Sequence, residues 1–298
     1  MKMIRSETGR LPRDPLPELS RNALVSTAWL AARADSDRFV VVECSSNPDA
    51  YASGHIPGAH ELDWRRDLRD LDSGDLIRGD QFAALAAGMG ITPETTVIFY
   101  GDESNWWAAF ALWLFQMNGH THTRLLDGGR DKWIRERRPL SLASPPPSHS
   151  EYRSIRDRRP AAFRASFTET AAHSRAGRAL LDVRSPMEFA GLISHPPDLP
   201  SEAAHRAGHI PGAVSLPWSL AVTESGTFRS TARLREIYED VHGLSPHDDI
   251  IVYCRIGERS SHTWFVLTQL LGFQHVRNYD GSWTDWGNRS DTPLETIT

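Results

Sequence analysis

One cysteine of this 298-residue chain stands in a setting that could make it a nucleophile. Cys254 follows the apolar run Ile250–Tyr253 and opens the segment Cys-Arg-Ile-Gly-Glu-Arg, in which Arg255 and Arg259 lie on either side of Gly257. A thiolate is stabilised by backbone N–H groups turned into a tight loop, by the N-terminus of a following helix, and by nearby cations. We therefore predict a reactive thiolate at Cys254, with a pKa below its usual value.

The other cysteine, Cys44, has a different setting. It follows three valines and has no adjacent arginine, lysine or glycine loop. Most free cysteines act as small buried hydrophobic residues, and we predict that role for Cys44, without catalysis. Two cysteines are too few for a disulfide framework or a four-thiolate zinc site, and the 13 histidines show no metal-binding spacing. We expect neither a metal nor a cofactor.

The elements that position Cys254 belong to an internal repeat. The hexapeptide Gly-His-Ile-Pro-Gly-Ala occurs at residues 54–59 and again at residues 208–213. A short apolar run ending near an acid precedes each copy, at Val40–Cys44 and at Ala179–Val183. Such runs are typical of buried strands.

Two further pairs of segments share one register. Ile250–Tyr253 lies 153 positions after Val97–Tyr100, and Tyr279-Asp280-Gly281 lies 153 positions after Leu126-Asp127-Gly128. The chain is therefore predicted to hold two copies of an α/β domain, each a mainly parallel sheet flanked by helices. The position matching Cys254 is Gly101, so only the second copy can carry out sulfur chemistry.

These markers set the expected domain organisation. We predict an N-terminal domain at residues 19–141, catalytically inactive, a linker at 142–164, and a C-terminal domain at 165–292. The linker contains three consecutive prolines and five arginines, four of them between residues 153 and 159, which is typical of a semi-rigid solvated segment. The second copy has 15 extra residues between its acid and its hexapeptide, around residues 190–206, which we expect to form a surface loop.

Composition excludes several classes of function. The chain has 33 Lys and Arg against 38 Asp and Glu, a net charge of −5, which makes nucleic acid an improbable partner. Its longest wholly apolar run, Trp106–Phe115, has ten residues, about half of a bilayer span. Residues 1–14 lack the apolar core of a secretory signal. We expect a cytoplasmic protein with no membrane partner; its oligomeric state stays open.

With these motifs the sequence resembles the tandem-domain rhodanese family, the thiosulfate and mercaptopyruvate sulfurtransferases. The resemblance runs from about Leu19 to Thr292 and includes both hexapeptides, the Cys254 loop and the final Tyr-Asp-Gly-Ser-Trp. It implies two rhodanese domains with the catalytic cysteine in the second. It also implies that this cysteine takes the outer sulfur of a donor as a persulfide and passes it to cyanide or a thiol. The partners would be a small-molecule sulfur donor and a thiophilic acceptor.

The resemblance and the charges suggest roles for the loop residues. Arg255 and Arg259 are candidates to hold the sulfonate of thiosulfate, since guanidinium groups suit oxyanions. Glu258 departs from the animal enzymes and matches a bacterial variant; it could repel an anionic donor or orient Arg259. Arg184 could contact the donor or pair with an acid. Animal enzymes often have a donor-binding arginine at the position of Glu188. Because this chain has glutamate there, we do not expect that donor contact.

Arginine directly after the cysteine resembles the thiosulfate type, so we expect thiosulfate as donor. Mercaptopyruvate is the alternative within the family. A non-enzymatic persulfide carrier for a protein partner is the alternative from another class. A rhodanese-fold phosphatase fits poorly, because its Cys-x5-Arg loop would require arginine where Ser260 stands.

Several residues occur in both copies and are expected to be structural. His55 and His209 should hydrogen-bond a turn, and Asp127 and Asp280 should cap one. Two tryptophans, Trp218 and Trp283, could either wall the site or belong to the core.

Overall fold

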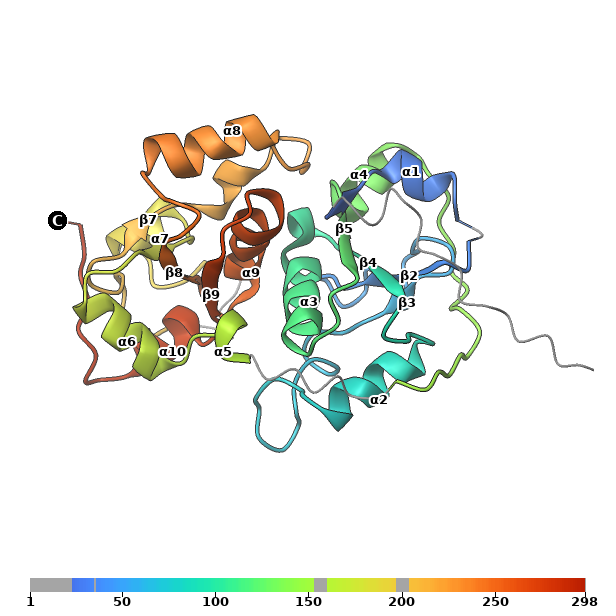
Figure 1. The fold of residues 1–298 in the computed structure, drawn as a ribbon, viewed down its shortest axis with the longest axis horizontal. Coiled ribbons are helices and arrows are strands. Elements are labelled where there is room, and N and C mark those ends of the chain that lie inside the picture. Colours follow the sequence, from blue (N-terminus) through green and yellow to red (C-terminus); the bar gives the residue numbers. More distant parts are fainter. Residues whose placement is uncertain (1–22, 35, 153–159, 197–203, 298) are drawn as a thin grey trace, which may run out of the picture.

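The computed structural model describes residues 23–34, 36–152, 160–196 and 204–297, which form two α/β halves lying side by side (Figure 1). The N-terminal half runs from β1 to α4 and the C-terminal half from α6 to α10. Each half is built on one parallel sheet with helices against it. This confirms the predicted α/β class and the duplication.

The N-terminal sheet has the strand order β1-β5-β4-β2-β3, and every neighbouring pair is parallel. Its strands are β1 (Leu24–Val25), β2 (Phe39–Glu43), β3 (His60–Glu61), β4 (Thr96–Tyr100) and β5 (Thr123–Leu126). The helices that join and flank them are α1 (Thr27–Ala31), α2 (Asp80–Gly88), α3 (Trp106–Met117) and α4 (Gly129–Arg135). Parallel strands require such crossovers, and the central strand β4 is buried along its whole length.

The C-terminal sheet has the order β7-β6-β8-β9 and is also parallel throughout. Its strands are β6 (Leu180–Asp182), β7 (Val214–Ser215), β8 (Asp249–Tyr253) and β9 (His275–Tyr279). Its helices are α6 (Phe167–Arg175), α7 (Pro186–Ala190), α8 (Thr231–Arg235), α9 (Glu258–Phe265) and α10 (Ser282–Asn288). Both α8 and α9 continue into wider π-type turns, over Glu236–Val241 and Val266–Leu270.

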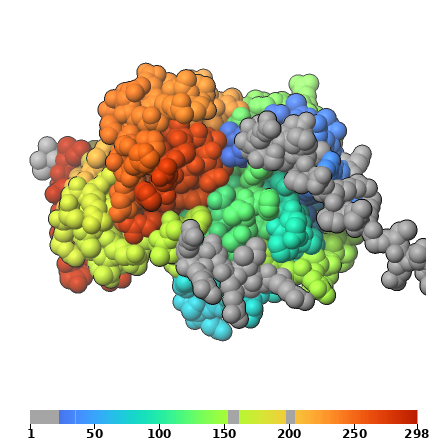
Figure 2. Space-filling view, viewed as in Figure 1, coloured from blue at the N-terminus to red at the C-terminus, as the bar shows by residue number. Residues whose placement is uncertain are grey.

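The two halves meet through α3 and α9, which lie against each other (Figure 1). Almost all of α3 is buried, because one side covers the N-terminal sheet and the other meets α9. A helix that is apolar all round is buried on all sides, which explains the ten-residue apolar run. One cluster of buried apolar side chains continues from one half into the other, and in the space-filling view the green and red surfaces abut (Figure 2).

The segment predicted as a linker is partly packed. Tyr152 is buried in the N-terminal core, and the short helix α5 (Pro160–Phe163) precedes Arg164. The Arg164 guanidinium pairs with Asp280 at 2.6 Å and with Asp75 at 2.7 Å, so it ties the halves together. Four other arginines of the segment, at 153, 156, 158 and 159, lie outside the described residues, as does part of the 190–206 insertion. Among the described helices, none is long and apolar enough to cross a membrane.

Candidate active site

Cys254 lies at the carboxyl edge of the C-terminal sheet, directly after β8. Its backbone is fixed on both sides by the start of α10: the Cys254 N–H donates to Ser282 Oγ at 3.0 Å, and Trp283 N–H donates to the Cys254 carbonyl at 3.0 Å. Helix α9 begins four residues later, at Glu258. The Cys254 side chain is fully buried. This is the strand, tight loop and buried helix that the sequence predicted.

Two groups donate hydrogen bonds to the sulfur. The Gly257 N–H lies 3.2 Å from Cys254 Sγ, and the Ser260 hydroxyl lies 3.4 Å from it. Gly257 has φ 105°, and a Cβ at this position would come within 3.1 Å of Asp280 and of Phe110 from α3. Glycine is therefore required both by the backbone conformation and by the close approach of the other half. The cradle of donors predicted from the loop is present.

A carboxylate also faces the sulfur. The Cys254 thiol donates to Glu258 Oε2 at 3.3 Å. The other oxygen, Oε1, accepts from Arg255 Nη2 at 3.0 Å and lies 3.4 Å from Arg259 Nε. Burial alone would raise the pKa of Glu258, but the two guanidinium groups outweigh it and hold this pKa below its ordinary value. Glu258 is thus a buried anion in contact with both arginines and the thiol.

The prediction of a lowered thiol pKa is wrong for this resting arrangement. Burial raises the pKa of Cys254, and the charge of Glu258 raises it further; Arg259 and Ser260 only partly offset these effects. The sequence argument counted the cations and the loop but neither full burial nor the adjacent carboxylate. This arrangement therefore favours the protonated thiol, with Glu258 Oε2 as its acceptor.

Arg259 is engaged by a second carboxylate. Its Nη1 and Nη2 donate to Glu188 at 2.9 and 3.0 Å, and both side chains are buried. Glu188 lies in the first turn of α7, where it forms a capping box with Ser185. Burial would raise the pKa of Glu188, but the Arg259 hydrogen bonds lower it to about 2. Arg255 and Arg259, which were predicted to bind the sulfur donor, are thus both paired with carboxylates.

Arg184 forms the structural pair that was one of its two predicted roles. Its Nη2 donates to Asp182 at 2.6 Å and to the Gly208 carbonyl at 2.7 Å, and the side chain is fully buried. The guanidinium lies 4.6 Å from the ring centroid of Trp283. Its Nη1 has no hydrogen-bond partner among the described residues. One nitrogen is therefore buried without a hydrogen bond to a described residue, while the others are committed.

Other predicted residues take the following places. His55 and His209 lie within hydrogen-bonding distance of backbone carbonyls, as predicted. Asp280 accepts two hydrogen bonds from Arg164, and Asp127 accepts the Phe228 N–H, so both carboxylates join distant segments rather than cap their own turns. Trp283 is buried; Trp218 is half-buried and meets Trp106 edge to face across the two halves.

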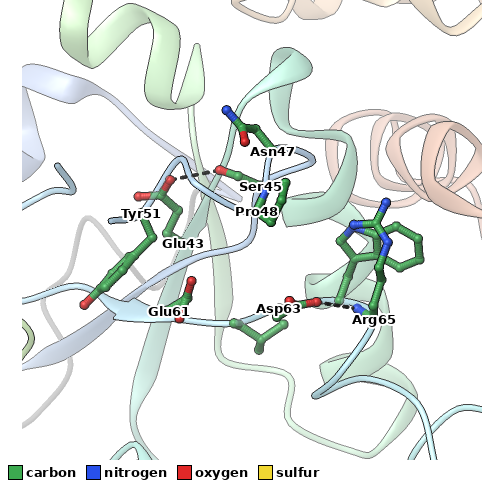
Figure 3. Close-up of a pocket in the computed structure, with 10 residues that line it drawn as sticks. Glu43, Ser45, Asn47, Pro48, Tyr51, Glu61, Asp63 and Arg65 are labelled. Atoms are coloured by element: carbon green, nitrogen blue, oxygen red, sulfur yellow. Dashed lines mark hydrogen bonds between the residues drawn. The ribbon is translucent and has the colours of Figure 1, made fainter. Parts of the chain in front are cut away.

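The N-terminal half has its own pocket, at the carboxyl ends of β2 and β3 (Figure 3). It is lined by Glu43, Ser45, Asn47, Pro48, Tyr51, Glu61, Leu62, Asp63, Trp64 and Arg65. None of these is a cysteine. Cys44 is fully buried, and burial together with Asp102 and Asp63 raises its pKa well above the usual value. Within the described ranges, no three His, Cys, Asp or Glu side chains gather closely enough to hold a metal ion.

Three contributors were missed by the sequence argument: Glu188 as the partner of Arg259, and the hydroxyls of Ser260 and Ser282. A signal existed for Ser282, because the aligned copy has Gly129 at this position. Ser185, three residues before Glu188, is a sequence signal for a helix start but not for the distant arginine. Nothing in the local sequence pointed to Ser260.

A cysteine opening a strand-to-helix loop, in the second of two parallel α/β domains, defines a tandem rhodanese-like protein. The rhodanese-like domain family matches residues 26–136 and 166–289. The chain therefore belongs to the rhodanese-like family and contains two copies of its domain.

Several relatives are similar over most of the chain. The chain is 45% identical to a thiosulfate sulfurtransferase of Corynebacterium glutamicum, over 96% of its own length and 95% of that protein. It is 48% identical to the sulfur carrier protein TtuD of Thermus thermophilus, over 91% and 95% respectively. Among solved structures, the anaerobic ergothioneine biosynthesis enzyme of Chlorobium limicola is 26% identical, with a TM-score of 0.78, over 93% of this chain and 71% of that one.

Proposed function

We propose that this protein is a thiosulfate sulfurtransferase that carries the transferred sulfur as a persulfide on Cys254. The observation that carries the proposal is the cradle around this thiol, in which Gly257 N–H and Ser260 Oγ donate to Sγ at 3.2 and 3.4 Å. Donors fixed in place stabilise a sulfur anion before and after it accepts a second sulfur. The relationship to the Corynebacterium enzyme supports the same reaction.

The reaction is a double displacement on sulfur. The Cys254 thiolate attacks the outer sulfur of thiosulfate, so that a new bond joins Sγ to that sulfur. The sulfur–sulfur bond of thiosulfate breaks, and its electron pair leaves on sulfite. Cyanide or a thiolate then attacks the outer sulfur of the persulfide, and the Cys254 thiolate is regenerated. This is covalent catalysis, which divides one transfer into two displacements.

Glu258 is proposed to hold the resting thiol in its protonated form. Its Oε2 accepts the thiol proton at 3.3 Å, and its negative charge raises the pKa of Cys254. Because the pKa of Glu258 lies below its ordinary value, this carboxylate is a poor base, and the thiol proton passes to water before the thiolate attacks. Glu258 thereby links the state of the thiol to the two arginines that it contacts.

The arginines are proposed to bind the sulfonate part of the donor. Arg255 Nη2 and Arg259 Nε now face Glu258, and an entering dianion would compete with this carboxylate for them. Arg184 Nη1 is a further candidate, because it is a buried cation donor with no partner among the described residues. Gly257 contributes through its N–H rather than through a side chain.

Two alternatives follow from specific observations. Mercaptopyruvate is the alternative donor, since one carboxylate could occupy the same arginines. A persulfide carrier is the second candidate function, because the relative from Thermus is named as a sulfur carrier and the Cys254 thiol is fully buried. A carrier would load once and release its sulfur only to a particular protein, whereas an enzyme turns over with small acceptors.

The test combines intact-mass measurement with turnover. Thiosulfate should add one sulfur atom to the wild type and to Cys44→Ser but none to Cys254→Ser, and cyanide should remove the added sulfur. Loading that survives in Cys254→Ser would refute the site. A large preference for mercaptopyruvate in turnover would refute the donor, and loading without multiple turnover on cyanide would favour the carrier.

A further inference from the structure

Ser282, the first residue of α10, has a backbone conformation that costs energy. Its φ is 52°, in the left-handed region that non-glycine residues rarely occupy, and its side chain is fully buried. Among the described residues, five non-glycine residues have a positive φ: Glu103, Ser104, Asn105, Arg137 and Ser282. Ser282 is the one that lies in the C-terminal half. Strain of this kind persists where the side chain contributes something that glycine cannot.

The N-terminal half has glycine at the matching position. Gly129 has φ 55°, nearly the same conformation, so the turn itself needs no side chain. A Cβ on Gly129 would lie 2.4 Å from the Gly101 carbonyl oxygen and 2.5 Å from Asn105 Oδ1. The half without the catalytic thiol thus has the unstrained residue, and the half with the thiol has serine.

The Ser282 hydroxyl connects the nucleophile to the end of β9. It accepts the Cys254 N–H at 3.0 Å and donates to the Tyr279 carbonyl at 2.7 Å, while Oγ lies 4.0 Å from Sγ. Because its single proton is used on Tyr279, its lone pairs face Cys254. The hydroxyl therefore fixes the peptide unit that carries the nucleophile.

The N-terminal half satisfies the equivalent N–H in another way. Gly101 N–H donates to Asn105 Oδ1 at 3.0 Å, and Asn105 stands where the active half has Glu258. If position 258 had to hold the Cys254 N–H, its carboxylate could not face the thiol and both arginines. Moving the acceptor to Ser282 leaves Glu258 free for those contacts.

We propose that Ser282 is a positioning residue for sulfur transfer, which holds Cys254 so that Sγ faces the Gly257 N–H and the Glu258 carboxylate. This inference rests on the proposed function. Without the hydroxyl, the buried Cys254 N–H loses its acceptor and the peptide turns to find another. The sulfur then leaves the orientation needed for in-line attack, and the chemical step slows while the donor-binding arginines stay in place.

The test compares Ser282→Ala with Ser282→Gly. Both variants lack the hydroxyl, but glycine adopts φ 52° without cost, so Ser282→Gly should melt at a higher temperature than Ser282→Ala. Single-turnover loading by thiosulfate, expressed per reactive thiol, should be about tenfold slower in both. The thiosulfate concentration that gives half the maximal rate should not change. Arg137→Gly, an exposed residue with φ 54°, is the matched control for strain relief and should load at the wild-type rate.

The outcomes distinguish a failure of this inference from a failure of the proposed function on which it rests. Wild-type loading together with unslowed Ser282 variants would overturn the role of Ser282 alone. A rate that follows melting temperature, slow in Ser282→Ala and normal in Ser282→Gly, would show a merely structural serine and overturn the role as well. Failure of the wild type to load on Cys254 would overturn the proposed function and this inference with it.

Discussion

The strand-to-helix loops after β4 and β8 share a scaffold and differ in what they hold. In both, the N-terminal residues of a later helix fix the loop: Arg130 N–H donates to the Gly101 carbonyl at 2.8 Å, as Trp283 N–H does to Cys254. The active loop then presents the Gly257 N–H to a sulfur. The other loop turns Asn105 inward to occupy its own Gly101 N–H. The two loops therefore differ in more than the presence of a thiol.

Away from the loops the halves are more alike. The isoleucine N–H of each hexapeptide donates to a buried tyrosine hydroxyl, from Ile56 to Tyr100 and from Ile210 to Tyr253. Each of these tyrosines interacts in turn with the acid that ends β2 or β6. The repeated hexapeptide thus supports the buried acid at the sheet edge, and this shared role explains its presence in a copy without the thiol.

The arginine that pairs with this buried acid comes from a different position in each half. Glu43 accepts from Arg130 of α4 at 2.8 Å, whereas Asp182 pairs with Arg184, two residues along the chain. Ser45 takes the position of Arg184 in the first copy and lines the open pocket there. An arginine thus neutralises the buried acid in both halves, and in the second half this arginine also lies over the ring of Trp283.

The largest effect is expected when the thiol is moved from the loop after β8 to the loop after β4. We expect Gly101→Cys in a Cys254→Ser background to load no sulfur from thiosulfate. A Cβ at position 101 would lie 2.2 Å from the Cys44 carbonyl oxygen, so the variant should also lose about 3 kcal/mol of stability from overpacking. Intact mass and chemical denaturation measure the two effects. Sulfur on the transplanted cysteine would show that the first loop lacks nothing but the thiol.

A smaller effect is expected from the second carboxylate around the active loop. Glu188→Gln leaves Arg259 without its buried anionic partner and should cost about 3 kcal/mol or less. The pKa of Glu188 is about 2 in the folded protein, below its ordinary 4.5. Its contribution is therefore complete above about pH 4.5 and is lost as the pH falls toward 2.

Denaturation curves between neutral pH and pH 3 check this linkage. The difference in stability between wild type and Glu188→Gln should shrink as the solution becomes more acidic. An equal difference at every pH would mean that the ionised pair contributes nothing specific. Glu224→Gln, which changes an exposed carboxylate in the same half, is the control and should alter stability little.

The next effect concerns reactivity of the thiol. In the wild type, the negative charge of Glu258, 3.3 Å from Sγ, raises the pKa of Cys254. Glu258→Gln removes this charge and should lower that pKa. The thiolate should then form at lower pH, and alkylation of Cys254 at neutral pH should be roughly tenfold faster. The pH profile of alkylation, followed by mass, measures it. A profile shifted toward higher pH would contradict the arrangement, because it would mean that Glu258 assists ionisation at rest.

Much of this could be predicted from sequence, because the information was local or repeated. The apolar runs, the hexapeptides and the shared register predicted two parallel α/β domains and placed Cys254 at a sheet edge. Glu258, which pairs with Arg255 and lies near Arg259, belongs to the same loop, but Glu188 could not be predicted in the same way, since it reaches Arg259 from a different segment. The direction of the Cys254 pKa was missed because full burial depends on tertiary packing, which no local motif describes, and because the charge of the nearby Glu258 was not counted.

The central claim is that sulfur is carried on Cys254 and not on Cys44. The most direct measurement is peptide mapping of wild-type protein after brief reaction with thiosulfate labelled in its outer sulfur. The account predicts label on the peptide that contains Cys254, complete loss of that label on adding cyanide, and none on the Cys44 peptide. Label on Cys44, or none on either cysteine, would contradict it.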